Sequence, residues 1–326
     1  MTGQVRPSLP RWRWLMFGWV PLMLGAAAIA QPPPDLALPQ GSRLAEHEPI
    51  TPIPSPPMAD PLKLALGERL FGDPRLSSGG DLSCSSCHDL KTNGASFHAT
   101  SATDNAHAPS FDTLTVFNAA LSFRLDWDGK FRSLAAQAQA SIENPASMRS
   151  SVSDAVGTLT TDPGIVRQFR AAYGHAPDGD SLLDALVTFE RSLVTPDSRF
   201  DRWLTGDGSA LSANELEGYR LFKSYGCIAC HQGVNAGSNL FERQGVFRPL
   251  VATGPKLVRV PSLRNVAVTA PYFHDGSAAT LEQAVRRMAW AQLDRTLTDE
   301  QIARIVAFLQ TLTGNYRGVP LTGAAP

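Results

Sequence analysis

The sequence predicts a mainly α-helical protein made of two similar helical domains. A Cys-x-x-Cys-His pentad occurs twice, at residues 84–88 and 227–231, and equivalent positions of the copies are 143 residues apart. The pattern Gly-x-x-Leu-Phe precedes each pentad, at residues 67–71 and 218–222, which indicates an internal duplication. Apolar residues recur with the period of an amphipathic helix in several segments, and no run alternates as a half-buried strand does.

The first 30 residues have the pattern of an export signal. Residues 14–30 are apolar, follow three arginines and end in Ala28-Ile29-Ala30, the small-x-small pattern of a signal-peptidase site. An uncleaved membrane anchor is the alternative, because this apolar segment lies at the short edge of what spans a bilayer. We therefore expect a periplasmic protein, with the signal either removed or retained as an anchor.

The composition is that of an ordinary globular protein. Apolar residues make up 43% and charged residues 18% of the 326 residues, which is enough for a sizeable core. The formal net charge is -1, and the three arginines of the export signal account for part of the positive charge. A balance so close to neutral predicts no nucleic-acid partner.

Local signals divide the rest of the chain. Residues 31–61 contain ten prolines and predict an extended linker that tethers or wraps the first domain. An N-terminal domain is expected at residues 62–195 and a C-terminal domain at residues 196–320. Helices are predicted at residues 62–71, at residues 180–194 before Pro196, and after three capping boxes. These boxes begin at Ser212, Thr280 and Thr298.

The two pentads predict covalent attachment of two c-type haems. The thiols of Cys84 and Cys87, and those of Cys227 and Cys230, would add to the vinyl groups of each haem. The adjacent His88 and His231 would bind the iron on the proximal side. A redox dithiol or half a zinc site is disfavoured, because a histidine follows both copies and the chain has an export signal. Each half therefore looks like a small cytochrome c unit.

Several longer stretches resemble bacterial di-haem cytochrome c peroxidases. They are Leu66-Gly-Glu-Arg-Leu-Phe-Gly-Asp-Pro-Arg-Leu-Ser77, Thr115-Val-Phe-Asn118, Trp127-Asp-Gly129, Phe189-Glu-Arg-Ser-Leu-Val-Thr-Pro-Asp-Ser-Arg-Phe-Asp201, and Val260-Pro-Ser-Leu-Arg-Asn-Val-Ala-Val-Thr-Ala-Pro-Tyr-Phe-His274 continuing to Met288. The resemblance runs from about residue 63 to residue 314. It implies reduction of hydrogen peroxide with electrons from a small donor, a cytochrome c or a cupredoxin. It also allows a homodimer.

The resemblance assigns roles to residues that would otherwise be ordinary. It implies that Met288 is the distal ligand of the C-terminal, electron-accepting haem, and that Trp127 lies between the haems and aids electron transfer. Without the family, both residues would be interpreted as core packing. The family also holds a calcium ion between its domains, and the matching positions here are Asp112, Thr269 and Pro271. An aspartate is a suitable oxygen ligand for this ion.

The N-terminal haem site departs from the family in two places. The displaceable distal histidine of the family falls at Asp104, and the nearest histidines are His98 and His107. Either could bind the iron if the loop is shifted, and a solvent-exposed loop histidine is the alternative for both.

The distal acid and base of the family is also replaced. A Glu-Met pair in the family reads Ser147-Met148 here, and a serine hydroxyl is too weak a base for this role at neutral pH. Gln137, which lies beside the peroxide site in the family, is retained. Glu143 is a candidate substitute, although Asn144-Pro145 breaks the helix between it and Ser147. Loss of a positioned acid or base costs ~10² to 10⁴ in rate, which predicts a slow peroxidase or a different enzyme.

Two other functions fit parts of the sequence. One is a di-haem electron carrier or redox sensor with a degenerate peroxidatic site, which the changes at positions 104 and 147 favour. The other is a protein-oxidising di-haem enzyme of the methylamine-utilisation type. Those enzymes carry tyrosine where this chain has Met288, and they keep the distal glutamate, so both positions argue against this function.

Overall fold

The computed structural model describes residues 47–95, 112–252, 254 and 256–323. The predicted export signal, most of the proline-rich segment, and the candidates His98, Asp104 and His107 lie outside the described residues. Contacts group the chain from Leu38 to Pro326 into one compact unit. The division into two domains at residue 195 therefore stays a prediction.

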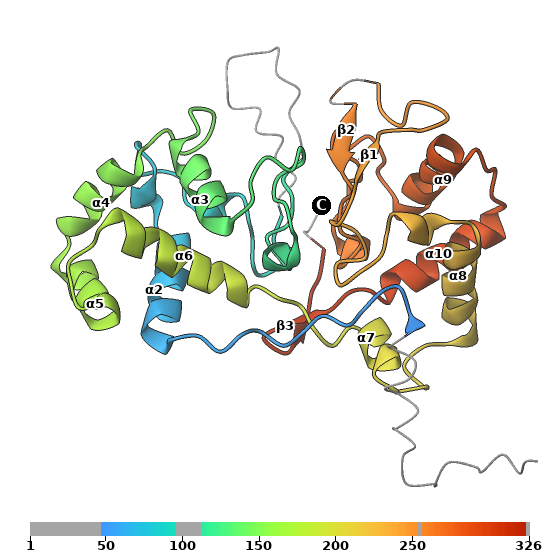
Figure 1. The fold of residues 1–326 in the computed structure, drawn as a ribbon, viewed down its shortest axis with the longest axis horizontal. Coiled ribbons are helices and arrows are strands. Elements are labelled where there is room, and N and C mark those ends of the chain that lie inside the picture. Colours follow the sequence, from blue (N-terminus) through green and yellow to red (C-terminus); the bar gives the residue numbers. More distant parts are fainter. Residues whose placement is uncertain (1–46, 96–111, 253, 255, 324–326) are drawn as a thin grey trace, which may run out of the picture. The chain divides into compact units, whose positions relative to one another are not determined.

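Helices dominate the described chain, as the sequence predicts (Figure 1). The α-helices are α2 (Pro61–Phe71), α3 (Leu134–Glu143), α4 (Val152–Thr160), α5 (Pro163–Tyr173), α6 (Gly179–Ser192), α7 (Arg199–Leu204), α8 (Ala213–Ser224), α9 (Leu281–Leu293) and α10 (Asp299–Gln310). Single 3₁₀ turns are η2 (Pro74–Leu76), η3 (Cys84–Ser86), η4 (Ala119–Leu121), η5 (Cys227–Ala229) and η6 (Val266–Val268). Two antiparallel pairs join β1 (Phe241–Arg243) to β2 (Leu257–Arg259), and β3 (Asn315–Tyr316) to β4 (Val319–Pro320).

The helix starts follow the local signals in the sequence. Asp60 caps α2 and accepts hydrogen bonds from the backbone N–H groups of Leu62 and Lys63. Reciprocal capping boxes are present at Ser212 and Thr298. The box predicted at Thr280 is only half formed. Thr280 caps α9, but the Gln283 side chain accepts from the backbone of Ala279 instead.

Two glycines allow two pairs of helices to cross in close contact. Gly67 of α2 lies against α6, where an added Cβ would strike the backbone carbonyl of Ala185 and the Cβ of Phe189. Gly218 of α8 lies against α10 in the same way, at Arg304 and Phe308. The Gly-x-x-Leu-Phe repeat therefore marks two equivalent helix crossings, because at each one only a glycine lets the backbones approach so closely.

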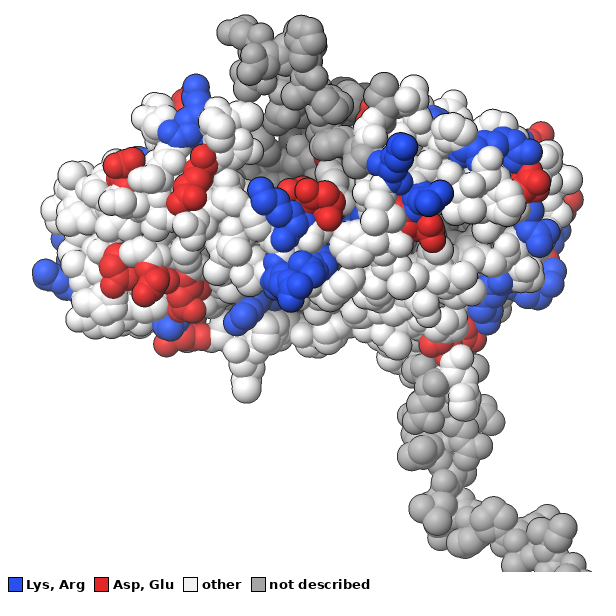
Figure 2. Space-filling view, turned by 45° about the horizontal axis from the view of Figure 1, so that its top comes forward, with Lys and Arg blue, Asp and Glu red and all other residues white. Residues whose placement is uncertain are grey.

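Charged side chains of both signs are mixed on the face shown in Figure 2. Several form exposed pairs, such as Arg317 with Glu68 at 2.8 Å and Lys63 with Asp184 at 2.9 Å. Such pairs contribute little stability, because both partners stay in water. None of the described helices is both long enough and apolar enough to cross a bilayer.

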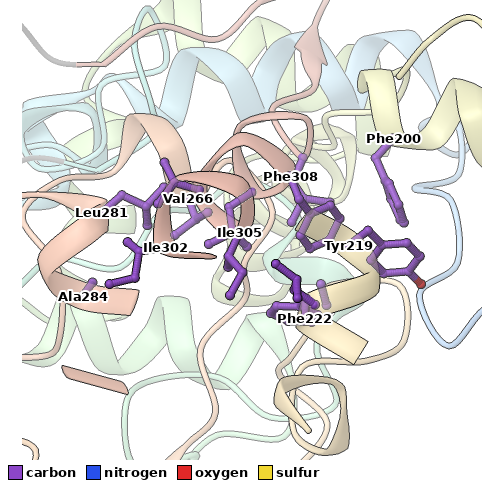
Figure 3. Close-up of a cluster of buried hydrophobic side chains, with 14 of the residues drawn as sticks. Phe200, Tyr219, Phe222, Val266, Leu281, Ala284, Ile302, Ile305 and Phe308 are labelled. Atoms are coloured by element: carbon purple, nitrogen blue, oxygen red, sulfur yellow. The ribbon is translucent and has the colours of Figure 1, made fainter. Parts of the chain in front are cut away.

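Two clusters of buried apolar side chains form the interior. The cluster in the C-terminal half, called the second core below, packs α8 and α10 against α9 and η6. Its Phe222 and Phe308 rings have centroids 5.2 Å apart (Figure 3). The first core packs α2 and α6 against α3, α4 and α5, with Phe71 and Phe189 at 5.3 Å. These two aromatic pairs occupy equivalent places at the two glycine crossings, which supports the duplication inferred from sequence.

The first described segment of the chain packs into the second core, and the last described segment packs into the first core. Ile50, from the proline-rich segment, is fully buried in the second core. Glu48 accepts a hydrogen bond from the Tyr219 hydroxyl at 2.6 Å and pairs with Lys223. At the other end, Leu321 is buried in the first core and the Tyr316 ring stacks on Phe117 at 4.9 Å. The described part of the predicted linker therefore begins as a strap packed through Ile50 and Ile53, whereas residues 54–57 and Met58 are exposed.

A buried ion pair fixes this strap. Arg264 and Asp201 are 2.9 Å apart, with side chains only 1% and 5% exposed. The Arg264 guanidinium also donates to the carbonyl of Thr51, and Asp201 accepts from the backbone N–H of Ile53. Both charges are satisfied by each other and by the strap, as buried charges must be.

We predict that Asp201→Ala lowers the free energy of unfolding by about 3–5 kcal/mol, because it leaves the Arg264 guanidinium buried without a counter-charge. Denaturant unfolding of the haem-loaded protein measures this loss. Asp207→Ala is the matched control, since Asp207 is an exposed partner of Arg202 at 3.6 Å and its loss should destabilise the protein far less. Equal losses in the two variants would contradict the assignment.

Candidate functional site

The pentads form the same backbone turn in both halves. In the first, the backbone N–H of His88 donates to the carbonyl of Cys84 at 2.9 Å, and in the second His231 donates to Cys227 at 3.1 Å. Each turn includes a 3₁₀ helix, η3 or η5. The turn places the first cysteine and the histidine on the same side, so that both can reach a single group.

The two histidines have one ring nitrogen engaged by backbone. His88 Nδ1 lies 3.0 Å from the Gly94 carbonyl, and His231 Nδ1 lies 3.3 Å from the Ala236 carbonyl. As donors, these nitrogens leave each Nε2 as the nitrogen that can bind a metal. Burial lowers the pKa of His88, and it lowers the pKa of His231 to about 4. Both imidazoles are therefore neutral at physiological pH, which is the form that binds iron.

A cavity of about 690 Å³ connects the two pentads. It is lined by Cys84, Cys87, His88, Cys227 and His231, while Cys230 lies on the same turn as His231. The cavity walls are mostly apolar, and its volume is in the range of sites for large organic ligands. The paired cysteine thiols, the Nε2 atoms of the two histidines and this cavity together fit two covalently held haems.

The walls of the cavity repeat between the halves. Helix α3 follows Trp127-Asp128-Gly129, and helix α9 follows His274-Asp275-Gly276, with 147 residues between equivalent positions. Each loop contains one β-bridge, Leu125 to Phe131 or Tyr272 to Ala278. Ahead of these loops, Asn118 and Asn265 both have φ of 62° and both donate to the Thr195 hydroxyl, at 2.8 and 3.0 Å.

Individual side chains that line the cavity also occur in equivalent pairs, one from each half. Helices α3 and α9 contribute five equivalent pairs, and α6 and α10 contribute two more. Most of these pairs are apolar in both halves. Three pairs differ in polarity, with the polar member always in the first half: Gln137 and Ala284, Ser141 and Met288, Glu190 and Leu309. The two haem environments therefore share a frame and differ in chemistry.

The predicted distal residues of the first half lie in a polar group on the cavity wall. Gln137, Ser141 and Ser147 all line the cavity. The Gln137 amide donates to the Ser141 hydroxyl at 2.9 Å, and the Ser147 hydroxyl donates to the Ser141 carbonyl at 3.3 Å. Because Asn144 ends α3, the chain turns and brings Ser147 and the buried Met148 back to the cavity.

Glu143 does not join this group. Its side chain is exposed, and its carboxylate accepts a hydrogen bond from Gln139 at 3.0 Å on the outer face of α3. It is absent from the residues that line the cavity. The structure therefore gives no support to Glu143 as a substitute acid and base, because α3 runs regularly through it and ends one residue later.

Trp127 lies on the wall of the cavity that both pentads share. Its indole Nε1 donates to the Asp112 carbonyl at 2.9 Å, and its ring meets the His274 ring edge-on at 6.2 Å. The Asp112 backbone N–H in turn donates to the His274 carbonyl at 2.8 Å. The equivalent residues of the two repeats thus contact each other, and Asp112 joins them.

The residues predicted to bind calcium also line this cavity. Asp112, Thr269 and Pro271 all line the cavity. Burial raises the pKa of Asp112 to about 6, so this carboxylate lies where a nearby cation would stabilise its charged form. No group of three or more His, Cys, Asp or Glu side chains that could hold a metal is found within the described ranges. A cation here would therefore depend largely on backbone carbonyl oxygens.

Sequence reasoning missed Glu190. This glutamate lines the cavity, is only 9% exposed, and its pKa is raised by burial to about 8. It lies within an amphipathic helix in which its neighbour Phe189 is fully buried. Alignment of α6 with α10 through the two glycine crossings would have matched it with Leu309 and shown it to be internal.

Comparisons with known proteins agree with this geometry. Residues 61–209 match the family described as di-haem cytochrome c peroxidase, and residues 216–313 match the cytochrome c family. A cytochrome c551 peroxidase from Nitrosomonas europaea is 39% identical, with 83% of this chain and 86% of that protein aligned. A cytochrome c peroxidase from Escherichia coli is 38% identical over 83% of this chain, which corresponds to 62% of the longer relative.

A solved structure shares the fold. The crystal structure of a MauG-like protein associated with microbial copper homeostasis superposes with a TM-score of 0.68 at 26% identity. The match covers 80% of this chain and 93% of that one.

Proposed function

Because this chain belongs to the di-haem cytochrome c peroxidase family, we propose that it reduces hydrogen peroxide at the haem held by Cys84, Cys87 and His88. Cys227, Cys230 and His231 would hold the haem that receives electrons from the donor. When bound, the haems supply one-electron transfer and the iron at which the peroxide O–O bond is cleaved. Two electrons and two protons convert one peroxide into two waters, so the chain must deliver both.

The difference between Ser141 and Met288 carries this proposal. Both residues lie at the same position of equivalent helices, and both face the cavity. A methionine thioether binds haem iron and closes its sixth position, whereas a neutral serine hydroxyl is a poor ligand. Met288 would therefore suit a haem held by Cys227, Cys230 and His231 to electron transfer, whereas Ser141 would offer a haem held by Cys84, Cys87 and His88 no strong ligand from α3.

Trp127 is proposed to lie on the electron path. Its ring stands on the wall shared by both haem sites and is held at its Nε1 by Asp112. The backbone N–H of Arg259 donates to the Trp127 carbonyl at 2.9 Å, so the second half also fixes this loop. An aromatic ring held from both halves supports rapid transfer between two fixed haems.

The residues near the open position bind and orient peroxide but do not act as strong acids or bases. Gln137 offers an amide, and Ser141 and Ser147 offer hydroxyls, linked by the hydrogen bonds described above. These groups can hold a peroxide and relay protons from solvent. Because none of them is charged at neutral pH, proton delivery limits the rate.

Location and partners follow from the export signal and the family. We place the protein in the periplasm, where haem attachment at Cys-x-x-Cys-His takes place, and take a small cytochrome c or a cupredoxin as the electron donor. A homodimer stays a prediction of the family resemblance. A calcium ion is proposed at Asp112, Thr269 and Pro271, which support it by lining the same cavity.

An electron carrier is the second candidate function. Met148 is 5% exposed and lines the first half of the cavity, so its thioether is available to the first haem as a sixth ligand. Met148→Leu separates the functions by electron paramagnetic resonance. A carrier closed by Met148 would change from low spin to high spin in this variant, and a peroxidase already open would not change.

A peroxide titration of the half-reduced protein tests the proposed function, with Ser141→Met as the decisive variant. We expect wild type to oxidise its donor and to show a high-spin signal from the first haem. In Ser141→Met the new thioether should close the site, convert that haem to low spin and lower turnover at least ten-fold. Ser141→Ala is the control and should stay open. The proposal fails if wild type neither responds to peroxide nor oxidises a donor.

We predict that Ser147→Glu raises peroxide turnover, by up to ~10², because it restores a carboxylate beside the Gln137 amide. Steady-state donor oxidation measures the gain. Ser147→Gln has the same shape without the charge and should give no gain, and Glu143→Gln should leave the rate unchanged because Glu143 faces solvent. A Ser147→Glu rate equal to wild type would mean that protons are not limiting.

We predict that Asp112→Ala weakens calcium binding by at least ~10-fold, since it removes the charged ligand of the proposed site. Calorimetric titration of chelator-treated protein with calcium provides the measurement. Asp128→Ala is the matched control, because Asp128 is exposed and caps the backbone of Lys130. Absence of calcium binding by wild type would end the calcium proposal without affecting the peroxidase proposal.

A further inference from the structure

Glu190 is a buried carboxyl group on the wall of the first haem site. Its side chain is 9% exposed, and its Oε2 atom accepts no hydrogen bond from any described residue. It lines the cavity together with Cys84. Burial and then the charge of Glu190 raise the pKa of the Cys84 thiol, which places the carboxylate within electrostatic reach of the haem attachment point.

The internal repeat shows that the helical frame does not require a carboxyl group here. Glu190 follows Phe189 on α6, as Leu309 follows Phe308 on α10, and both helices cross their partners at a glycine. Leu309 lines the second haem site and is 3% exposed. A leucine occupies the equivalent position in the second half, where the helices pack in the same way. The carboxylate is therefore a specific feature of the first site.

The charged groups around Glu190 are engaged elsewhere. Burial alone accounts for its raised pKa, with no nearby charge contributing. On the helices packed against α6, and on α6 itself, each charged group lies in another pair or in solvent. They are Lys63 with Asp184, Glu68 with Arg317, Arg69 with Asp162, Glu143 with Gln139, Asp154 with Ser151, and the exposed Asp180 and Arg191.

The described titratable groups that line the same cavity include the pentad residues Cys84, Cys87 and His88. The Cys84 and Cys87 thiols become uncharged thioethers on haem attachment, and His88 is neutral. The haem iron is then the group near Glu190 whose charge changes during turnover. Two charges inside a dry cavity interact strongly, because the low dielectric screens them little.

We propose that Glu190 takes up one proton when the first haem is reduced and releases it on oxidation, so that the potential of this haem depends on pH. This inference rests on haem attachment at Cys84 and Cys87, which is part of the proposed function. One electron from the donor lowers the charge at the iron by one, and one proton from solvent neutralises the carboxylate. The net charge buried in the cavity is then unchanged, which avoids the cost of adding an uncompensated charge.

Spectroelectrochemical titration of the full haem-loaded protein from pH 6 to pH 9 tests the proposal. In wild type the potential of the first haem should fall as pH rises, because a charged Glu190 favours the oxidised iron. The potential of the second haem, beside Leu309, should change less. In Glu190→Gln, and in Glu190→Leu, which copies the second half, the fall should disappear. Glu143→Gln, an exposed carboxylate on the neighbouring helix, should behave as wild type.

An equal fall in wild type and Glu190→Gln would overturn the proposal, as would a wild-type potential that does not change with pH. Potentials are measured without peroxide, so this failure is distinct from failure of the peroxidase activity.

The folding free energy gives an independent measurement on the same variants. The pKa of Glu190 is raised by burial from its ordinary value to about 8. The folded state therefore holds this proton more tightly than the unfolded chain does. Relative to Glu190→Gln, wild type should be most stable below about pH 4.5 and lose stability as pH rises towards 8. Parallel stability profiles for the two proteins would show that Glu190 is not buried as a titrating group.

Discussion

The two helix crossings at Gly67 and Gly218 are the constraint on which the rest of the structure depends. At each crossing a glycine lets one helix rest directly on the backbone of another, at Ala185 in one half and Arg304 in the other. Any side chain would separate the helices, and because the contact is to backbone it cannot be relieved by a rotamer change. The crossings therefore fix how far α6 and α10 are rotated, and this rotation decides which of their side chains face the cavity.

Because the crossings fix the arrangement of the helices, a few side chains are enough to give the two halves different functions. The aromatic pairs beside the crossings have nearly the same spacing in both cores. Ser141 and Met288, which differ, lie on the cavity wall and belong to neither buried cluster. A change at such a position alters the environment of the haem without creating a void between helices. One half can therefore specialise without loss of packing in the other half.

The sequence predicted those parts of the structure that have local signals. Helices α2 and α6 and the caps at Ser212 and Thr298 depend on short sequence segments, and the structure contains them as expected. The packed strap around Ile50 could not be predicted, because prolines favour extended chain but do not show what that chain contacts. Glu143 was a candidate by its distance in sequence from Ser147. Its exposure depends on the rotation of α3, which tertiary packing sets.

Some of the residues that line the cavity could have been predicted from the sequence. The matching of Asn118 with Asn265, and of Trp127-Asp-Gly with His274-Asp-Gly, has a constant spacing that an alignment of the two halves would reveal. That alignment would have paired Ser141 with Met288 before any coordinates were known. It would not have shown that Glu190 is buried without a partner, because its place in the repeat does not reveal its hydrogen bonds or depth.

The proposed function places different demands on the two halves. The second half only passes electrons, and an apolar wall with one thioether is enough for this, since no proton has to move. The first half must bring electrons and protons to the same place, and it contains the three polar departures at Gln137, Ser141 and Glu190. Ser147 gives it no distal carboxylate, and among the residues that the structure describes, the carboxyl group that lines this half with its side chain buried is Glu190, on α6. Proton balance at the first haem is therefore set from the wall near Cys84 rather than from the family's distal position.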